Sequence, residues 1–90
     1  MIKEKITITD RVGLHLRPAG ELCKEACKYK SKIELTCKNT TVNAKSVISV
    51  LSACVKFNDE IEITCDGEDE EEALKNVIAV LSGREENSEL

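Results

Sequence analysis

Apolar residues along this chain follow two spacings, and the order of these spacings constrains the fold more than any other feature. A spacing of two residues is typical of a strand with one buried face. A spacing of three and four residues is typical of a helix with one buried face. The strand spacing occurs in three segments: 2–8, 33–37 and 61–65. The helical spacing also occurs in three: 19–27, 47–51 and 74–81.

The order of these segments predicts how they pack. Lys38-Asn39-Thr40 is a turn signal after the second strand, so a short fourth strand over 41–43 can return as a hairpin. The resulting order is β-α-β-β-α-β-α. Because each strand is apolar on one face only, we expect an α+β fold in which helices cover one face of a four-stranded antiparallel sheet. Lysine, threonine and glutamate would cover the other face.

Capping residues predict where the helices begin and end. Proline is tolerated in the first helical turn, so the first helix is expected to begin at Pro18, where its apolar pattern starts. Ser46 is a candidate N-cap of the second helix. Asp69 is a candidate N-cap of the third, whose acidic first turn (70–72) we expect to be solvated and whose end is expected at 82–83.

The single histidine of the chain lies in the string Gly13-Leu14-His15-Leu16-Arg17-Pro18-Ala19. If a helix begins here, the imidazole lies beside unpaired backbone N–H groups, the positive end of the helix dipole and the Arg17 guanidinium. This combination is an anion site that contains a nucleophile. A packed structural histidine is the alternative interpretation of His15.

Composition excludes several other functions. The net charge is −4, and the chain has one phenylalanine, one tyrosine and no tryptophan, which disfavours nucleic-acid binding. No apolar run reaches the length of a membrane span, and the first residues lack the apolar stretch of a signal peptide. We therefore expect a cytoplasmic protein that does not bind a membrane, and we take a monomer as the default state.

Five cysteines are numerous for a cytoplasmic chain, and they raise the question of zinc or redox chemistry. There is no Cys-x-x-Cys pair, and the one histidine belongs to a different motif, so neither role fits well. We therefore expect no metal or cofactor, with the cysteines serving as small buried hydrophobes. The count is odd, so at least one is unpaired in a monomer. The five are Cys23, Cys27, Cys37, Cys54 and Cys65.

Two sequence blocks resemble the HPr family, the histidine-containing phosphocarriers of the bacterial phosphoenolpyruvate:sugar phosphotransferase system. The first block is the string 13–19, which is similar to the family's Gly-Leu-His-Ala-Arg-Pro-Ala. The second is Asn43-Ala44-Lys45-Ser46-Val47-Ile48-Ser49-Val50-Leu51, which is similar to the family's serine-phosphorylation segment. The resemblance implies a phosphocarrier domain over 1–85, followed by a charged tail over 86–90, and an open-faced β-sandwich fold.

The resemblance also implies a role for three residues. His15 would accept a phosphoryl group on Nδ1 from phosphorylated enzyme I and pass it to enzyme IIA domains of sugar transporters. Arg17 would neutralise that group. Ser46 would be phosphorylated by an ATP-dependent kinase, HPr kinase/phosphorylase, which would slow the relay and create a surface for a catabolite-control transcription factor. Ser46 could also be a helix cap and nothing more.

Val47, Ile48 and Leu51 could all belong to the core, but a short helix cannot bury every apolar residue around it, and the resemblance implies a docking surface beside His15. Its expected members are Leu16, Gly20, Val47, Ile48 and Leu51. The chain departs from the family at Leu16, where alanine is usual, at Ser49, where glycine is common, and at Phe57-Asn58, which replaces a Lys-Gly turn. Asparagine tolerates positive φ, so that turn can survive and leave Phe57 exposed.

Three alternatives stay open. The chain could be an adaptor that acts mainly through phosphorylated Ser46, although relatives of that type lack the histidine. It could carry phosphoryl groups in a nitrogen-related phosphotransferase chain. An acylphosphatase-like or RNA-binding sandwich has a similar gross shape, but this chain lacks the arginine–asparagine signature or the aromatic platform which those proteins need.

Overall fold

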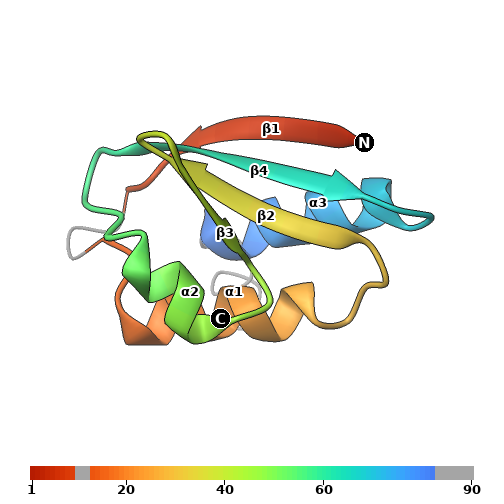
Figure 1. The fold of residues 1–90 in the computed structure, drawn as a ribbon, viewed down its shortest axis with the longest axis horizontal. Coiled ribbons are helices and arrows are strands. Elements are labelled where there is room, and N and C mark those ends of the chain that lie inside the picture. The colour runs from red at the N-terminus through yellow and green to blue at the C-terminus, as the bar shows by residue number, and fades with distance from the viewer. Residues whose placement is uncertain (10–12, 83–90) are drawn as a thin grey trace, which may run out of the picture.

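Four strands form one antiparallel sheet in the spatial order β1-β4-β2-β3, shown in the computed structural model of Figure 1. The structure describes residues 1–9 and 13–82. Along the chain the elements are β1 (Ile2–Thr7), α1 (Leu16–Ala26), β2 (Lys32–Cys37), β3 (Thr40–Asn43), α2 (Val47–Ser52), β4 (Glu60–Asp66) and α3 (Glu70–Leu81). The predicted element order and the open, four-stranded antiparallel sheet are confirmed.

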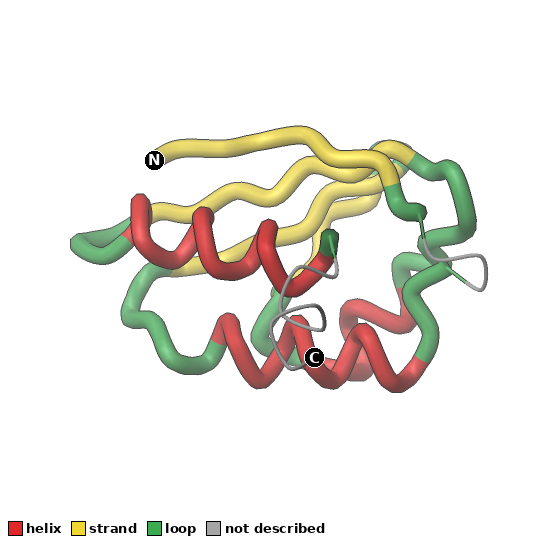
Figure 2. The backbone as a smooth tube through the Cα atoms, turned by 180° about the vertical axis from the view of Figure 1, so that it is seen from behind, coloured by secondary structure: helices red, strands yellow, loops and turns green. Residues whose placement is uncertain are grey.

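The helices lie on one side of the sheet and the core lies between the two layers (Figure 2). Strand pairing places inward-facing residues of neighbouring strands opposite one another, as in Leu35↔Ile63 and Ile33↔Cys65. From the helical layer, Leu22 of α1 and Val77 of α3 are completely buried. The alternation read from the sequence therefore identifies the core-facing residues of β1, β2 and β4 correctly.

The β2–β3 hairpin turns through two residues, Lys38 and Asn39, which both have positive φ (51° and 68°). Two positive φ values match the twist that joins adjacent antiparallel strands, and asparagine adopts them readily. Thr40 already pairs with Cys37, so β3 begins one residue earlier than the turn signal predicted.

The start of α1 differs from the prediction. The helix begins at Leu16 and not at Pro18, which occupies the third helical position. The first helical hydrogen bond runs from Ala19 N to His15 O (3.0 Å). Because Pro18 precedes that first required donor, its missing N–H costs the helix nothing, and a proline alone does not fix which residue of the first turn comes first.

The two predicted caps have different outcomes. Ser46 caps α2, since its Oγ accepts a hydrogen bond from Ser49 N (3.3 Å). Asp69 occupies the N-cap position of α3, but its side chain makes no cap bond. Its carboxylate instead accepts from Lys30 N, Ser31 N and Ser31 Oγ (2.9, 3.0 and 2.5 Å). Asp69 is thus the N-cap residue, as predicted, but its carboxylate binds a loop 38 residues away instead of the N–H groups of α3.

The cysteine prediction is correct for two of five residues. Cys37 and Cys65 are buried, whereas Cys23 is half-buried and Cys27 and Cys54 are exposed. Helix α1 turns Ala19, Leu22 and Ala26 into the core, so the row of Cys23 and Cys27 lies at its rim. Cys54 follows the end of α2 with φ 54° and points outward.

Two predictions concern residues outside the described ranges: Gly83 as a helix stop and the tail over 86–90. Within residues 1–9 and 13–82, the structure has no helix of the length and hydropathy needed to cross a membrane.

Candidate functional site

His15 is the N-cap residue of α1, with extended backbone angles (φ −93°, ψ −168°) and a half-buried side chain. Its carbonyl accepts the first helical hydrogen bond, from Ala19 N. The expected position of the imidazole at a helix N-terminus is therefore confirmed. A half-buried ring is held in place while part of it stays accessible to a partner.

The loop before His15 is fixed against the segment that follows α2. Leu14 N donates to Val55 O (3.0 Å), and Leu14 is buried. Gly13 has φ +85°, and a Cβ there would lie 2.5 Å from Val55 O and 2.9 Å from Lys56 Cα. Glycine is required because both the backbone angle and the close approach exclude a side chain. The position of His15 thus depends on residues about 40 positions later in the sequence.

Backbone donors and a cation surround the start of α1. Helix geometry leaves the N–H groups of Leu16 and Arg17 without partners inside the helix, and Pro18 has none to offer. The first turn contains no acidic residue, and Arg17 is exposed. This end of the helix is consequently suited to an anion with several oxygens, such as a phosphoryl group next to the imidazole.

Helices α1 and α2 lie side by side (Figures 1 and 2), and both carry accessible apolar residues. Leu16 is 67% exposed and Ile48 is 77% exposed, whereas Val50 of α2 is completely buried. Val47, Leu51 and Gly20 are half-buried. We call these five accessible residues, Leu16, Gly20, Val47, Ile48 and Leu51, the α1–α2 patch.

The turn after α2 keeps the conformation expected for Phe57-Asn58. Asn58 has φ 73°, and Phe57 is 49% exposed. Asp59 Oδ2 accepts from Lys56 N (2.9 Å) and lies 3.4 Å from Lys38 Nζ. These contacts, the Lys56 N–H first among them, lower the pKa of the Asp59 carboxyl. The turn that abuts Gly13 is therefore closed by its own carboxylate.

Sequence reasoning missed the positioning role of Lys45. Its Nζ donates to Tyr29 O at the end of α1 (2.7 Å), and its carbonyl accepts from Cys23 Sγ (2.8 Å). These contacts fix the residue before Ser46 against α1. No local sequence signal could have revealed them, because the partners lie 16 and 22 residues away.

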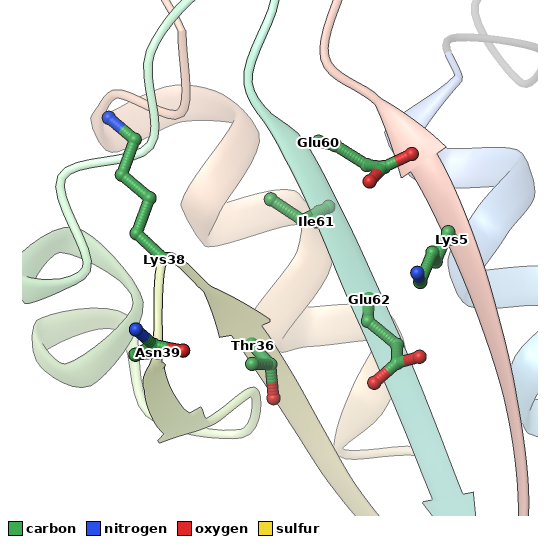
Figure 3. A pocket seen from close by; sticks show the side chains of 7 residues that line it. All are labelled: Lys5, Thr36, Lys38, Asn39, Glu60, Ile61 and Glu62. Atoms are coloured by element: carbon green, nitrogen blue, oxygen red, sulfur yellow. The ribbon is translucent and has the colours of Figure 1, made fainter.

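Other parts of the described chain offer no competing centre. Residues 1–9 and 13–82 contain no group of three or more His, Cys, Asp or Glu side chains arranged to hold a metal ion. A hollow of about 330 Å³ lies on the sheet (Figure 3). It combines acidic and basic side chains and lacks histidine and cysteine. Its lining is Lys5, Thr36, Lys38, Asn39, Glu60, Ile61 and Glu62.

Comparison with known families and proteins identifies the family of the chain. Residues 2–82 match the family described as the PTS HPr component phosphorylation site. The phosphocarrier protein HPr of Mycoplasma genitalium is 44% identical over 82 residues, covering 90% of this chain and 93% of the relative. The phosphocarrier protein HPr of Mycoplasma capricolum is 40% identical, covering 86% of both chains.

Solved structures have the same fold. HPr from Thermoanaerobacter tengcongensis superposes with a TM-score of 0.88 at 34% identity, covering 92% of this chain and 93% of that one. A mycoplasma histidine-containing phosphocarrier protein gives 0.81 at 38% identity, covering 89% and 97%. Crh, the catabolite repression protein of Bacillus subtilis, was solved as a domain-swapped dimer and gives 0.73 at 33% identity, covering 91% and 94%.

Proposed function

The chain belongs to the HPr family of phosphocarrier proteins of the phosphotransferase system, and from that premise we propose that His15 is its phosphoryl acceptor. The group would come from phospho-enzyme I to Nδ1 of His15 and go on to an enzyme IIA domain in sugar uptake. The observation that carries the proposal is the position of His15 as the half-buried N-cap residue of α1, beside Arg17.

The transfer needs an unprotonated imidazole nitrogen and a neutralised phosphoryl group. The bond between phosphorus and its donor atom breaks as the bond to Nδ1 forms, and an imidazole nitrogen can attack near neutral pH. The N–H groups of Leu16 and Arg17 and the guanidinium of Arg17 would hold the phosphoryl oxygens. Arginine suits this role because its planar fork can give two hydrogen bonds to one phosphoryl group.

A carrier must bind several partners in turn and leave each one quickly. The α1–α2 patch supports such docking, because Leu16, next to His15 in the chain, and Ile48 of α2 are both mostly exposed. A small interface is suited to weak, short-lived complexes. We infer that the chain is a stoichiometric cytoplasmic carrier, a protein substrate and not an enzyme, and that it acts as a monomer without a cofactor.

Ser46 is proposed as a second, regulatory phosphorylation site for a serine kinase of the HPr kinase/phosphorylase type. Its Oγ lies at the start of α2, where a phosphate would gain from the helix dipole and accept the Ser49 N–H that the hydroxyl accepts now. Negative charge beside the α1–α2 patch would slow docking of enzyme I and favour a different partner, such as a catabolite-control transcription factor.

The test of the carrier proposal is phosphorylation of the purified protein by phosphoenolpyruvate and enzyme I, followed by intact mass and acid treatment. We expect a gain of one phosphoryl group that is lost in acid and absent from His15→Ala. Ser46→Ala is the matched control and should be phosphorylated as the wild type is. An acid-stable phosphoryl group, or a group that His15→Ala still gains, would contradict the proposal.

The regulatory proposal is tested separately with ATP and the serine kinase. We expect an acid-stable phosphoryl group that disappears in Ser46→Ala and is retained in His15→Ala. Phosphorylation by this kinase that is unaffected by Ser46→Ala would contradict it. A protein modified only on Ser46 and never on His15 would instead act as a regulatory adaptor.

A further inference from the structure

Two thiols of α1 converge on one backbone oxygen. Cys23 and Cys27 lie four residues apart, so they occupy the same face of the helix. Cys23 Sγ lies 2.8 Å from Lys45 O, and Cys27 Sγ lies 3.7 Å from the same oxygen. Cys27 is exposed and Cys23 is half-buried, so solvent reaches this pair directly.

The two sulfurs also interact with each other. Burial raises the pKa of the Cys23 thiol, and the charge of the nearby Cys27 sulfur raises it further. The other cysteines form no comparable pair: Cys37 and Cys65 are buried, and Cys54 is exposed on a different segment. Any soft ion that reaches the folded protein therefore meets two adjacent sulfurs at one place only among the described residues.

Helix geometry disfavours a direct bond between these sulfurs. Side chains four residues apart on a helix have Cβ atoms about 5–6 Å apart. A disulfide requires Cβ atoms about 3.5–4.5 Å apart. An atom placed between the sulfurs removes this mismatch, because each sulfur then bonds to the bridging atom and the helix keeps its geometry.

We propose that Cys23 and Cys27 form a two-thiolate binding site for a soft monovalent cation of the Cu(I) type. Thiolates are the ligands that select Cu(I). Cu(I) is satisfied by two of them, whereas a structural zinc ion takes four ligands. The described part of the chain offers no third His, Cys, Asp or Glu side chain near the pair. On binding, both S–H protons leave and two sulfur–metal bonds form, so no electron is transferred.

Ion binding would have a local consequence. Once both sulfurs hold the ion, neither can donate to Lys45 O, whereas the bond from Lys45 Nζ to Tyr29 O is unaffected. The connection between α1 and the residue before Ser46 would then depend on the lysine side chain alone. Faster amide exchange at the start of α2 should accompany the bound ion.

The test uses Cu(I) itself, held by bicinchoninate under oxygen-free conditions, with native mass spectrometry to count bound ions. We expect one ion per chain. Cys23→Ser and Cys27→Ser should each weaken binding by more than about 100-fold, since even groups outside the ligand shell are worth about 10–100-fold in metal affinity. Serine can donate to Lys45 O as the thiol does, so both variants should keep the wild-type thermal midpoint.

Cys54→Ser is the matched control, because it removes an exposed thiol on a different segment, after α2. It should leave Cu(I) binding within about twofold of the wild type, as is usual for surface substitutions away from a site. Two results would overturn the proposal. One is unchanged binding in both Cys23→Ser and Cys27→Ser, and the other is an equal loss in Cys54→Ser. Neither result depends on phosphorylation of His15.

Discussion

The two ends of α1 differ: buried polar contacts hold one end, whereas the other leaves apolar side chains exposed. One end carries His15 and the exposed Leu16, and the other leads into the loop that holds Ser31 against the start of α3 (Figure 1). Ser31 is completely buried, and its N–H and Oγ both donate to the Asp69 carboxylate. Gly67 leaves room for this contact, since a Cβ there would lie 2.6 Å from Ser31 Oγ.

The His15 end leaves comparable groups exposed. Leu16 and Ile48 project into solvent, and Cys54 and Asn58 adopt positive φ close to the segment that positions Leu14. Exposed apolar side chains and unfavourable backbone angles cost stability and are concentrated at functional sites. We infer that the Ser31–Asp69 end stabilises the fold, whereas the exposed side chains of the His15 end serve the proposed docking of partners.

The largest effect is expected for Arg17→Ala, which should slow phosphoryl transfer and leave stability almost unchanged. Loss of one charged donor to a developing phosphoryl anion typically slows transfer by about 10²–10³-fold. Arg17 is exposed, so the free energy of unfolding should change by less than about 0.5 kcal/mol. The measurement is the rate of phosphorylation by enzyme I, with Arg17→Lys as the conservative control. A wild-type rate in Arg17→Ala would show that Arg17 does not contribute to phosphoryl transfer.

Val50 and Ile48 allow effects on stability and on docking to be compared within a single helix, α2. Val50→Ala should cost about 2 kcal/mol of unfolding free energy, because Val50 is completely buried. Ile48→Ala should leave stability within about 0.5 kcal/mol, because Ile48 is mostly exposed. Ile48→Ala should instead raise the KM of this protein in the enzyme I reaction about tenfold. This change corresponds to a loss of about 1.4 kcal/mol of docking free energy. Denaturant titration and transfer kinetics decide between these effects, and an unchanged KM would show that the patch is not used.

Asp69→Asn should change how stability depends on acid at the Ser31–Asp69 end. The Ser31 hydroxyl, the Lys30 N–H and the Ser31 N–H lower the pKa of the Asp69 carboxyl in the folded protein. Its stabilising contribution is therefore present above the unfolded pKa of about 3.9 and is lost as pH falls through the lower folded value. The variant should be less stable at pH 7, and the difference should shrink toward pH 2. A difference that is constant with pH would contradict this.

Gly20→Ala should produce the smallest effect, and in the opposite direction. A Cβ at Gly20 meets no atom within 4 Å, and the residue lies inside α1. Alanine should stabilise the protein by about 0.5–1 kcal/mol. Thermal denaturation measures this directly. The same substitution at Gly13, where the backbone has positive φ and no space, should destabilise the protein.

The sequence predicts the sheet and its buried face, because strand alternation depends only on neighbouring residues. It predicts the Ser46 cap for the same reason, since the partner is three residues away. It misplaces the first residue of α1, because Pro18 fits several positions of a first turn. It does not predict the contacts of the Asp69 side chain, whose partner Ser31 lies 38 residues away.

The sequence predicts those parts of the candidate site whose residues are neighbours in the chain. His15, Arg17 and Pro18 are neighbours, and their residue types alone indicate an anion site. The positions of Gly13 against Val55 and of Lys45 against α1 depend on contacts across the fold, and no local pattern encodes them. The exposure of Cys27 depends in the same way on what packs beside the helix.

The most direct test of the account follows the ring nitrogens of His15 by NMR during phosphorylation with enzyme I, because this is the only histidine of the chain. We predict that Nδ1 gains the phosphoryl group, with amide shifts at 13–17 and in α2 and none at Ser31 or Asp69. Modification of Nε2, an unmodified ring in a phosphorylated protein, or equal shifts at the Ser31–Asp69 end would contradict the division between the two ends.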